Sequence, residues 1–291
     1  MTNAPATRLV SLLEAMDASD DYRLLRRVPE EPPIEPDDGS PTMSVAVVDV
    51  ETTGLDPDSD RIVELAIRRI RMTLDGRLVG LGERRSWLED PGRPLDAEVV
   101  RLTGLTDADL EGRRIDDRTA VSVLRASDLV VAHNAGFDRP FVERRLPQVA
   151  GGAWACTCND VDWAALGFEG RSLSHLMFQL GMFFDGHRAA SDVAALIAML
   201  VHRLRDGRAL FEVLLETARR DTVLVDAVDA PFEAARVLRA RGYRWNQRDR
   251  RWRREIGEEA LGAECEWLDR KVYSSGGAPA YSRVTWRERH A

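Results

Sequence analysis

Short apolar runs rich in β-branched residues begin at residue 44 and predict a set of neighbouring strands. The first run covers residues 44–50, and the second covers residues 61–72. Asp75 and Gly76 form a hairpin signal that leads from the second run into a third, RLVGLGERRSWL. We therefore expect three strands that follow one another closely along the chain.

Strand and helix patterns alternate after these runs. Residues 128–133 form an apolar run that breaks into a helical pattern over residues 137–146. Apolar residues then recur at helical spacing over residues 192–204, and they are Val193, Leu196, Ile197, Leu200, Val201 and Leu204. Three strands followed by this alternation predict an α/β domain over residues 44–205, with a mixed sheet flanked by helices.

The regions on either side of this domain have different patterns. Residues 1–43 start with a short amphipathic helix and end in a Pro- and acid-rich stretch, which we interpret as an extended linker. The apolar stripe of the helix consists of Leu9, Leu12, Leu13 and Met16. Residues 221–291 contain a helix that ends at Gly242 and a hairpin that turns near Gln247–Asp249. We predict a small C-terminal α+β module of β-α-β-β-α-β type there.

Composition places the chain among globular proteins. Its 291 residues leave room for one main core and an accessory unit, and 44% hydrophobic with 31% charged residues suits a soluble protein. No apolar run approaches the ~20 residues of a membrane-spanning helix, and the N-terminus lacks the pattern of a secretory signal. Cys156, Cys158 and Cys265 cannot build a disulfide framework. We expect a cytoplasmic protein without a membrane partner.

The net charge argues against a nucleic-acid partner, but the distribution of charge does not. The chain carries a formal charge of −8 and has a pI near 5.3. Residues 236–254 nevertheless hold nine arginines against one aspartate, interleaved with Tyr243, Trp245 and Trp252. This combination offers phosphate contacts and stacking faces, and the candidate contacts are Arg244, Trp245, Arg250, Arg251, Trp252 and Arg253. The alternative is a hairpin with aromatics in its own core and solvated arginines.

Four carboxylates and one histidine lie where apolar strands or helices begin or end. Asp49 and Glu51 are two residues apart on the first strand, so they project from the same face. Burying both at a strand end is expensive unless a cation lies between them. Asp138 lies where a later strand breaks into a helix, and His187 and Asp192 lie at the head of another helix. This set suits two hard divalent metal ions and a general base.

The three segments that carry these residues resemble the signature blocks of DEDDh 3′–5′ exonucleases, the family of the epsilon-type proofreading subunits. The segments are DVETTGL, HNAGFD and HRAASD, which match D-x-E, H-N-x-x-F-D and H-x-x-x-x-D in order and spacing. His187 stands five residues before Asp192. The sister branch of the family has a tyrosine four residues before that aspartate, where this chain has Arg188. The resemblance spans roughly residues 44–205 and implies a ribonuclease-H-like fold.

The resemblance also implies a role for each residue of the site. The four carboxylates would hold two divalent metal ions, Mg²⁺ or Mn²⁺, and His187 would act as the general base. Other residues would border the 3′-terminal nucleotide, namely Thr52, Thr53, Gly54, Leu55 and Thr103. Asn134 would help to orient the scissile strand.

Several of these residues also have an ordinary structural explanation. Asp138 and Asp192 could be acids in the first turn of a helix, favoured by its dipole, and Asn134 could be no more than an N-cap. His187 could be a surface histidine, although it stands where the general base of the family belongs. His133 is better explained as a structural hydrogen-bonding residue.

One segment bears on protein partners in replication or repair. QLGMFF, residues 179–184, superficially resembles a sliding-clamp-binding peptide. It lies between a helix and His187, inside the expected catalytic domain, and we interpret it as a core segment.

The expected activity is metal-dependent 3′–5′ hydrolysis of DNA that releases nucleoside 5′-monophosphates, in repair or proofreading, with a single-stranded 3′ end as the partner. An RNA-directed exonuclease of the oligoribonuclease or ribonuclease T kind would use the same residues, because 2′-OH recognition depends on pocket geometry. A non-catalytic binder of nucleic-acid ends is a further alternative, although it would not need a general base. The chain lacks a recognisable tail for docking a polymerase, which favours a standalone enzyme.

Overall fold

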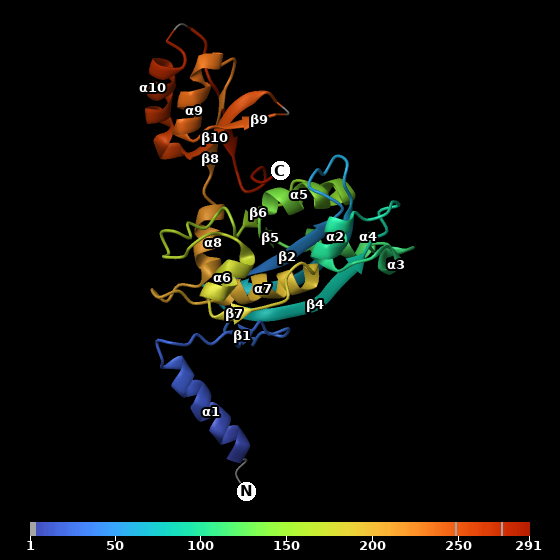
Figure 1. Cartoon of the computed structure of the whole chain (residues 1–291). Helices are drawn as coiled ribbons and strands as arrows, with labels where there is room; N and C mark the ends of the chain where they lie inside the picture. The colour runs from blue at the N-terminus through green and yellow to red at the C-terminus, as the bar shows by residue number, and fades with distance from the viewer. Residues whose placement is uncertain (1–3, 248, 275) are drawn as a thin grey trace. The chain divides into compact units, whose positions relative to one another are not determined.

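The computed structural model describes residues 4–247, 249–274 and 276–291, and the chain divides into two compact units (Figure 1). The first unit consists of Met1–Thr217 and His290–Ala291, and the second consists of Ala218–Arg289. Each unit has its own sheet and its own buried core. None of the helices in these described ranges is long and apolar enough to cross a membrane.

The sheet of the first unit has five strands in the order β4-β3-β2-β5-β6. They are β2 (Thr42–Thr52), β3 (Ile62–Thr73), β4 (Leu78–Leu88), β5 (Leu129–Ala132) and β6 (Trp154–Cys156). β2, β3 and β4 pair antiparallel, whereas β5 and β6 extend the sheet in parallel. Gly76 turns the β3–β4 hairpin at a φ of 85°, a left-handed conformation that glycine adopts readily. The predicted hairpin and the predicted mixed sheet are confirmed.

Helices cover this sheet because its central strand β2 is apolar on both faces. Ala46, Val48 and Val50 share one core with residues of α4 (Asp117–Arg125) and α5 (Ala135–Arg145). Residues of opposite parity, Asp49 among them, point to the other face, where α7 (Ala189–Val201) lies beside β2 and β3. The two helices predicted over residues 137–146 and 192–204 are α5 and α7, and both begin a few residues earlier than expected.

The first unit contains further elements, and of these only α6 (Leu173–Gln179), the helix expected before residues 179–184, was predicted from the sequence. The others are α2 (Ala97–Thr103), α3 (Asp107–Leu110), η1 (Pro147–Val149), β7 (Met182–Phe183) and α8 (Leu210–Ala218). β7 pairs in parallel with β1 (Arg26–Arg27). The interpretation of QLGMFF as a core segment is therefore wrong, because none of its six residues is fully buried and Phe183 of β7 is 38% exposed.

The N-terminal region contains the predicted helix as α1 (Ala4–Asp17), and Leu9, Leu12 and Leu13 of its apolar stripe are exposed. The acid-rich stretch that follows is extended. It is not a free linker, because ion pairs hold it along the sheet. Arg68 contacts Glu31 at 2.7 Å, and further pairs of this kind are Arg71 with Asp37 and Arg77 with Asp38.

The second unit has the predicted order β-α-β-β-α-β. Its elements are β8 (Thr222–Ala227), η2 (Phe232–Ala234), α9 (Ala235–Arg241), β9 (Arg244–Asn246), β10 (Arg251–Gly257), η3 (Glu258–Ala260), α10 (Leu261–Lys271) and β11 (Ala280–Val284). The strands pair antiparallel in the order β11-β8-β10-β9. Gly242 ends α9 at a φ of 98°, as predicted. Arg248, in the predicted turn of the β9–β10 hairpin, lies outside the described residues.

Candidate active site

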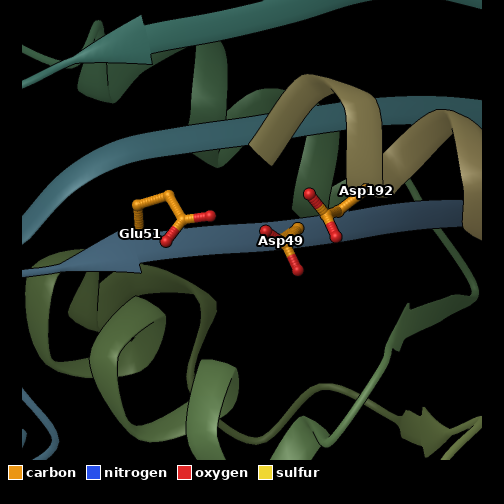
Figure 2. A group of neighbouring side chains, drawn as sticks. All are labelled: Asp49, Glu51 and Asp192. Atoms are coloured by element: carbon orange, nitrogen blue, oxygen red, sulfur yellow. The ribbon is translucent and has the colours of Figure 1, made fainter. Parts of the chain in front are cut away.

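Three of the predicted carboxylates meet at the end of the central strand. Asp49 and Glu51 lie on β2, and Asp192 lies in the first turn of α7. One oxygen atom from each carboxylate lies within 4.8 Å of the other two. Figure 2 shows Asp49 between Glu51 on the same strand and Asp192 on the helix. Across the described part of the chain, this is the one group of three or more His, Cys, Asp or Glu residues that could share a metal ion.

Asp138 approaches the same strand from α5. Its side chain is 2% exposed, and Oδ1 accepts a hydrogen bond from the backbone N–H of Val50 at 3.2 Å. Val50 is the residue between Asp49 and Glu51, so this bond fixes Asp138 against the part of β2 that carries the other acids. Asp138 lies outside the group of three oxygens within 4.8 Å, but it is close enough for its charge to raise the pKa of Asp49.

Electrostatics at this place suit a cation. Burial, followed by repulsion from Asp138 and Asp192, holds the pKa of Asp49 well above its ordinary value. Burial and repulsion from Asp192 raise the pKa of Glu51 to about 7, and burial raises the pKa of Asp192 to about 6. A nearby divalent cation reverses such shifts because it stabilises the ionised form. Hard carboxylate oxygens are also the donors that Mg²⁺ and Mn²⁺ prefer, so the residues present fit these ions.

Glu64 of β3 is a neighbouring acid that the sequence analysis missed. It is 1% exposed and lies directly opposite Glu51 in the strand pair. Its charge contributes to the raised pKa values of Asp49, Glu51 and Asp192. A signal was present in the sequence, since a glutamate within the apolar run of a buried strand must have polar partners.

Glu64 has such partners. Ser86 Oγ donates a hydrogen bond to its carboxylate at 2.9 Å, and Arg188 Nε lies 3.0 Å from its Oε2. Arg188 directly follows His187, and its backbone N–H donates to Asp192 Oδ2 at 3.3 Å. The ion pair therefore connects a core strand to the residues that begin α7.

His187 lies two residues before α7 begins. Its side chain is exposed, and its backbone has a φ of 63°, in the left-handed region. This conformation is uncommon for residues other than glycine, although histidine adopts it more often than most. The predicted general base and the carboxylate of Asp192 thus flank the same helix start.

The turn after β2 carries four residues predicted to border the terminal nucleotide. Thr52 Oγ1 donates to the carbonyl oxygen of Gly54 at 2.5 Å, and Thr53 Oγ1 donates to Asp60 Oδ1 at 3.0 Å. A Cβ on Gly54 would lie 2.4 Å from Asp60 Oδ2, so a larger residue there would displace the Asp60 carboxylate from its place in the turn. Leu55 is 83% exposed. The hydroxyls therefore shape the turn, and Leu55 is the side chain that it presents to solvent.

Thr103 and Asn134 differ in how free their side chains are. The hydroxyl of Thr103 is buried, where it donates to the carbonyl oxygen of Val99 at 2.9 Å and accepts from the N–H of Leu105 at 3.1 Å. This hydroxyl closes the end of α2, and Thr103 acts through the backbone that it shapes. Asn134 occupies the N-cap position of α5 with a φ of 69° and makes no side-chain cap hydrogen bond. Its exposed amide therefore remains available to a ligand.

His133 has the structural role predicted for it. Nδ1 lies 2.8 Å from Thr157 Oγ1, and Nε2 lies 2.8 Å from the carbonyl oxygen of Arg171. Burial lowers the pKa of His133 to about 4, so the ring is neutral near neutral pH. A neutral histidine with both nitrogens engaged joins two segments of the domain.

The predicted nucleic-acid contacts of the second unit fall into two groups. Arg244, Arg250 and Arg251 are exposed, as is Trp245 at 46%. Arg253 is not free, because it contacts Asp226 of β8 at 2.6 Å. Trp252 of β10 is partly buried and packs against the core of the module.

Comparison with known proteins identifies the class of this site. Residues 46–200, more than half of the chain, match the model of the RNase_T family, described as exonuclease. The matched stretch contains the four carboxylates and His187. The chain belongs to this exonuclease family, and the predicted family and its ribonuclease-H-like fold class are confirmed.

Individual relatives resemble the same region. The PolC-type DNA polymerase III of Thermotoga petrophila is 32% identical over 152 residues, which cover 50% of this chain and 11% of that protein. The PolC-type DNA polymerase III of Bacillus subtilis is 38% identical over 102 residues, which cover 33% of this chain and 6% of that protein. The matched regions are thus small parts of much longer relatives.

Solved structures show similarity at a lower level. A structure of exonuclease X with 5′ overhanging duplex DNA is 25% identical, has a TM-score of 0.43, and covers 60% of this chain and 99% of that chain. A zinc-bound E. coli exonuclease I complex with single-stranded DNA is 17% identical, with a TM-score of 0.49, and covers 84% of this chain and 64% of that chain.

Proposed function

We propose that the chain is a metal-dependent 3′–5′ exonuclease that releases nucleoside 5′-monophosphates from the 3′ ends of single-stranded DNA. The observation that carries the proposal is the convergence of Asp49, Glu51 and Asp192 within 4.8 Å, in a chain of an exonuclease family. Asp138 completes the set through its hydrogen bond to Val50. A non-catalytic binder of strand ends would have no use for four crowded acids beside a histidine.

The four carboxylates would hold two divalent metal ions, Mg²⁺ or Mn²⁺. When bound, such ions would supply Lewis acidity to the attacking water and neutralise charge on the phosphate. Repulsion between the acids keeps them poised for this role, because each raises the proton affinity of its neighbours until a cation replaces the protons.

His187 would accept the proton of the attacking water. In-line attack of that water on phosphorus forms one P–O bond and breaks the bond between phosphorus and the 3′ oxygen of the preceding nucleotide. The released 3′ oxygen takes up a proton from solvent, and the terminal nucleotide leaves as its 5′-monophosphate. The exposed position of His187, beside Asp192 at the start of α7, allows it to exchange this proton with water.

Leu55 and Asn134 would contact the strand. Leu55 is the exposed apolar residue of the turn after β2 and would pack against the terminal base. Asn134, exposed at the start of α5 four residues before Asp138, would donate to the backbone of the scissile strand.

DNA is the favoured substrate because the similar relatives are described as DNA polymerase III proteins. We place the enzyme in the cytoplasm, in DNA repair or proofreading with replication or repair proteins as partners. An RNA-directed enzyme would use the same carboxylates and histidine.

Matched DNA and RNA oligomers with a 5′ label test the proposal. With Mn²⁺, the DNA oligomer should give a ladder of shortened labelled products and free nucleoside 5′-monophosphates, and the RNA oligomer should react more slowly. Faster hydrolysis of RNA would reassign the substrate, and release of the label as a mononucleotide would reverse the polarity. Binding without hydrolysis would favour an end-binding protein.

A further inference from the structure

The described arginines of the basic segment 236–254 are of two kinds. Some form ion pairs within the module, and others are exposed and have no ion-pair partner among the described residues. Glu264 of α10 is 2% exposed, and its carboxylate contacts Arg241 at 3.0 Å and Arg254 at 2.8 Å. Tyr243 Oη also donates to this carboxylate at 3.0 Å. Arg253 pairs with an acid of β8. These residues hold the module together and are not available to a ligand.

The remaining described arginines of the basic segment are exposed, and we call them the arginine surface. They are Arg236, Arg239, Arg244, Arg250 and Arg251. Within the described residues, no ion pair neutralises any of them. Asp249, the single acid of the segment, is already paired with Arg253 at 2.5 Å. The arginine surface therefore keeps its positive charge although the chain as a whole is acidic.

Trp245 is an aromatic side chain of the same hairpin that remains partly exposed to solvent. Trp245 on β9 and Trp252 on β10 face each other across the hairpin, with ring centroids 5.6 Å apart and planes inclined at 64°. The guanidinium of Arg239 lies 5.6 Å from the ring of Trp252 and covers it. Trp245 remains 46% exposed, so packing fixes its ring while part of it faces solvent.

β9 is an edge strand, which makes both faces of the hairpin reachable from one side. The register places Arg244 and Arg251 on the face opposite to Trp245. A flexible strand that follows this edge can place phosphates against the arginines and a base against the indole.

We propose that the arginine surface and Trp245 form a docking site for single-stranded DNA, outside the catalytic carboxylates. Positive charge complements the phosphates, and the exposed indole provides a stacking face that accepts any base. This inference rests on the proposed function, because the docked strand is the substrate. The site would retain long strands and leave the hydrolysis of very short ones unchanged.

Full-length variants test this docking site in metal-free buffer with a chelator, where hydrolysis cannot occur. The first variant combines Arg244→Ala, Arg250→Ala and Arg251→Ala, and the probe is a long oligodeoxythymidine. Each lost phosphate contact should flatten the plot of log affinity against log salt by about 0.7 units, so three should flatten it by about 2. Trp245→Ala should weaken binding about 5- to 100-fold without changing this slope.

A matched control removes the same charge elsewhere. Arg69, Arg118 and Arg125 are exposed arginines of the first unit, and changing all three to Ala should leave the slope unchanged. Equal slopes for the hairpin variant and the wild type would overturn the docking site. Hydrolysis of a dinucleotide by the wild type is measured separately, and its absence would refute the proposed exonuclease without affecting the binding result.

A second inference concerns the loop between β7 and α7. Arg27 pairs with Asp185 at 2.8 Å before His187, and Arg188 pairs with Glu64 at 3.0 Å after it. The backbone N–H of Ala189 also lies 3.4 Å from Glu64 Oε2. The Arg27–Asp185 pair is exposed and restrains the loop little, whereas Arg188, the residue next to His187, is tied to the buried carboxylate of Glu64.

The geometry points to Glu64 and Arg188 as positioning residues for His187. Glu64 belongs to the core strand β3, so its ion pair with Arg188 fixes the loop to the sheet and restricts its motion. The inference also rests on the proposed function, because His187 is the group that it orients. Displacement of a catalytic group by about 1 Å can lower a rate about 100-fold.

A double-mutant cycle tests this positioning role. Arg188→Ala should lower kcat about 10- to 100-fold with little change in KM, and Arg188→Lys should recover part of the loss. In a His187→Ala background, Arg188→Ala should have no further effect, because the group that it positions is gone. The rise in Tm on adding Mn²⁺ should not fall in either single variant, because neither residue would hold the metal.

Failure of the positioning role and failure of the proposed function would give different results. Equal losses of kcat from Arg188→Ala in both backgrounds would make Arg188 a contributor independent of His187 and overturn the inference. A wild-type protein without hydrolysis would instead refute the proposed function.

Discussion

The first unit and the C-terminal module differ in how their inward-facing acidic side chains are surrounded. At the end of β2, Asp49, Glu51 and Asp192 lie close together, and burial with mutual repulsion raises their pKa values. In the module, Glu264 is more deeply buried, at 2% exposed, but it is surrounded by two guanidinium groups and a phenol. Among the described residues, Asp49, Glu51 and Asp192 thus have no ion-pair partner of their own, whereas Glu264 has two.

This difference separates an acid that binds a ligand from an acid that stabilises a fold. A compensated carboxylate holds its partners in place, and removing it leaves their charges unsatisfied. Crowded carboxylates lower the stability of the folded chain until a cation joins them. Replacing a carboxylate by the isosteric amide should therefore have opposite effects on stability in the two units.

Asp49→Asn should produce the largest change in activity. It removes a ligand from the centre of the acid group, and hydrolysis of a labelled DNA oligomer with Mn²⁺ should fall below about 10⁻⁴ of the wild-type rate. Its Tm without metal should hold or rise, because one of several repelling charges is gone. Near-normal turnover, or a clear fall in the metal-free Tm, would contradict the assignment.

His187→Ala should produce the second-largest change in activity and lower kcat by about 10²–10⁴-fold. The imidazole would move a proton and would not hold the metal, so the rise in Tm on adding Mn²⁺ should match that of the wild type. His175→Ala is a control, because His175 is an exposed histidine on α6. Lost metal binding in His187→Ala would show that the histidine is a ligand.

Glu264→Gln tests the other half of the comparison. It keeps the shape of the side chain but removes the charge that compensates Arg241 and Arg254, so the module should lose about 2–3 kcal/mol of stability. This value is at the low end for buried pairs because both arginines are about one-third exposed. Denaturant unfolding followed by tryptophan fluorescence measures the loss. Dinucleotide hydrolysis should not change.

The raised pKa values also predict how stability depends on pH. The pKa of Glu51 rises from 4.5 to about 7, and the pKa of Asp192 rises from 3.8 to about 6. Between these values the folded chain binds protons that the unfolded chain releases, so its metal-free free energy of unfolding should fall as pH rises. Because metal binding displaces these protons, the gain in Tm from Mn²⁺ should grow over the same range. A flat metal-free profile in the wild type, or one unchanged in Asp49→Asn, would count against the crowded site.

The sequence predicted the clustering of the four carboxylates better than the residues that support them. Asp49 and Glu51 share a strand face through a local period of two, and Asp138 and Asp192 begin helices whose apolar spacing is local as well. The partnership of Glu64 with Arg188 joins residues 124 positions apart, and no local pattern encodes such a pair.

In the C-terminal module, too, local sequence patterns predicted the elements but not the tertiary contacts. Its order of elements followed from local turns and periods, and Gly242 marked the end of α9. Which arginines are free depends on tertiary contacts, because only the folded module shows that Glu264 binds Arg241 and Arg254. Tyr243 stood among the candidate stacking faces in the sequence but is 2% exposed in the structure.

Calorimetric titration of Mn²⁺ into the wild type and into Asp49→Asn tests the metal centre most directly. The wild type should bind two ions with release of protons, and the release should increase as pH falls toward the raised pKa values of Glu51 and Asp192. Asp49→Asn should lose at least one of the two ions. Equal binding by both proteins, or none by the wild type, would contradict the metal centre.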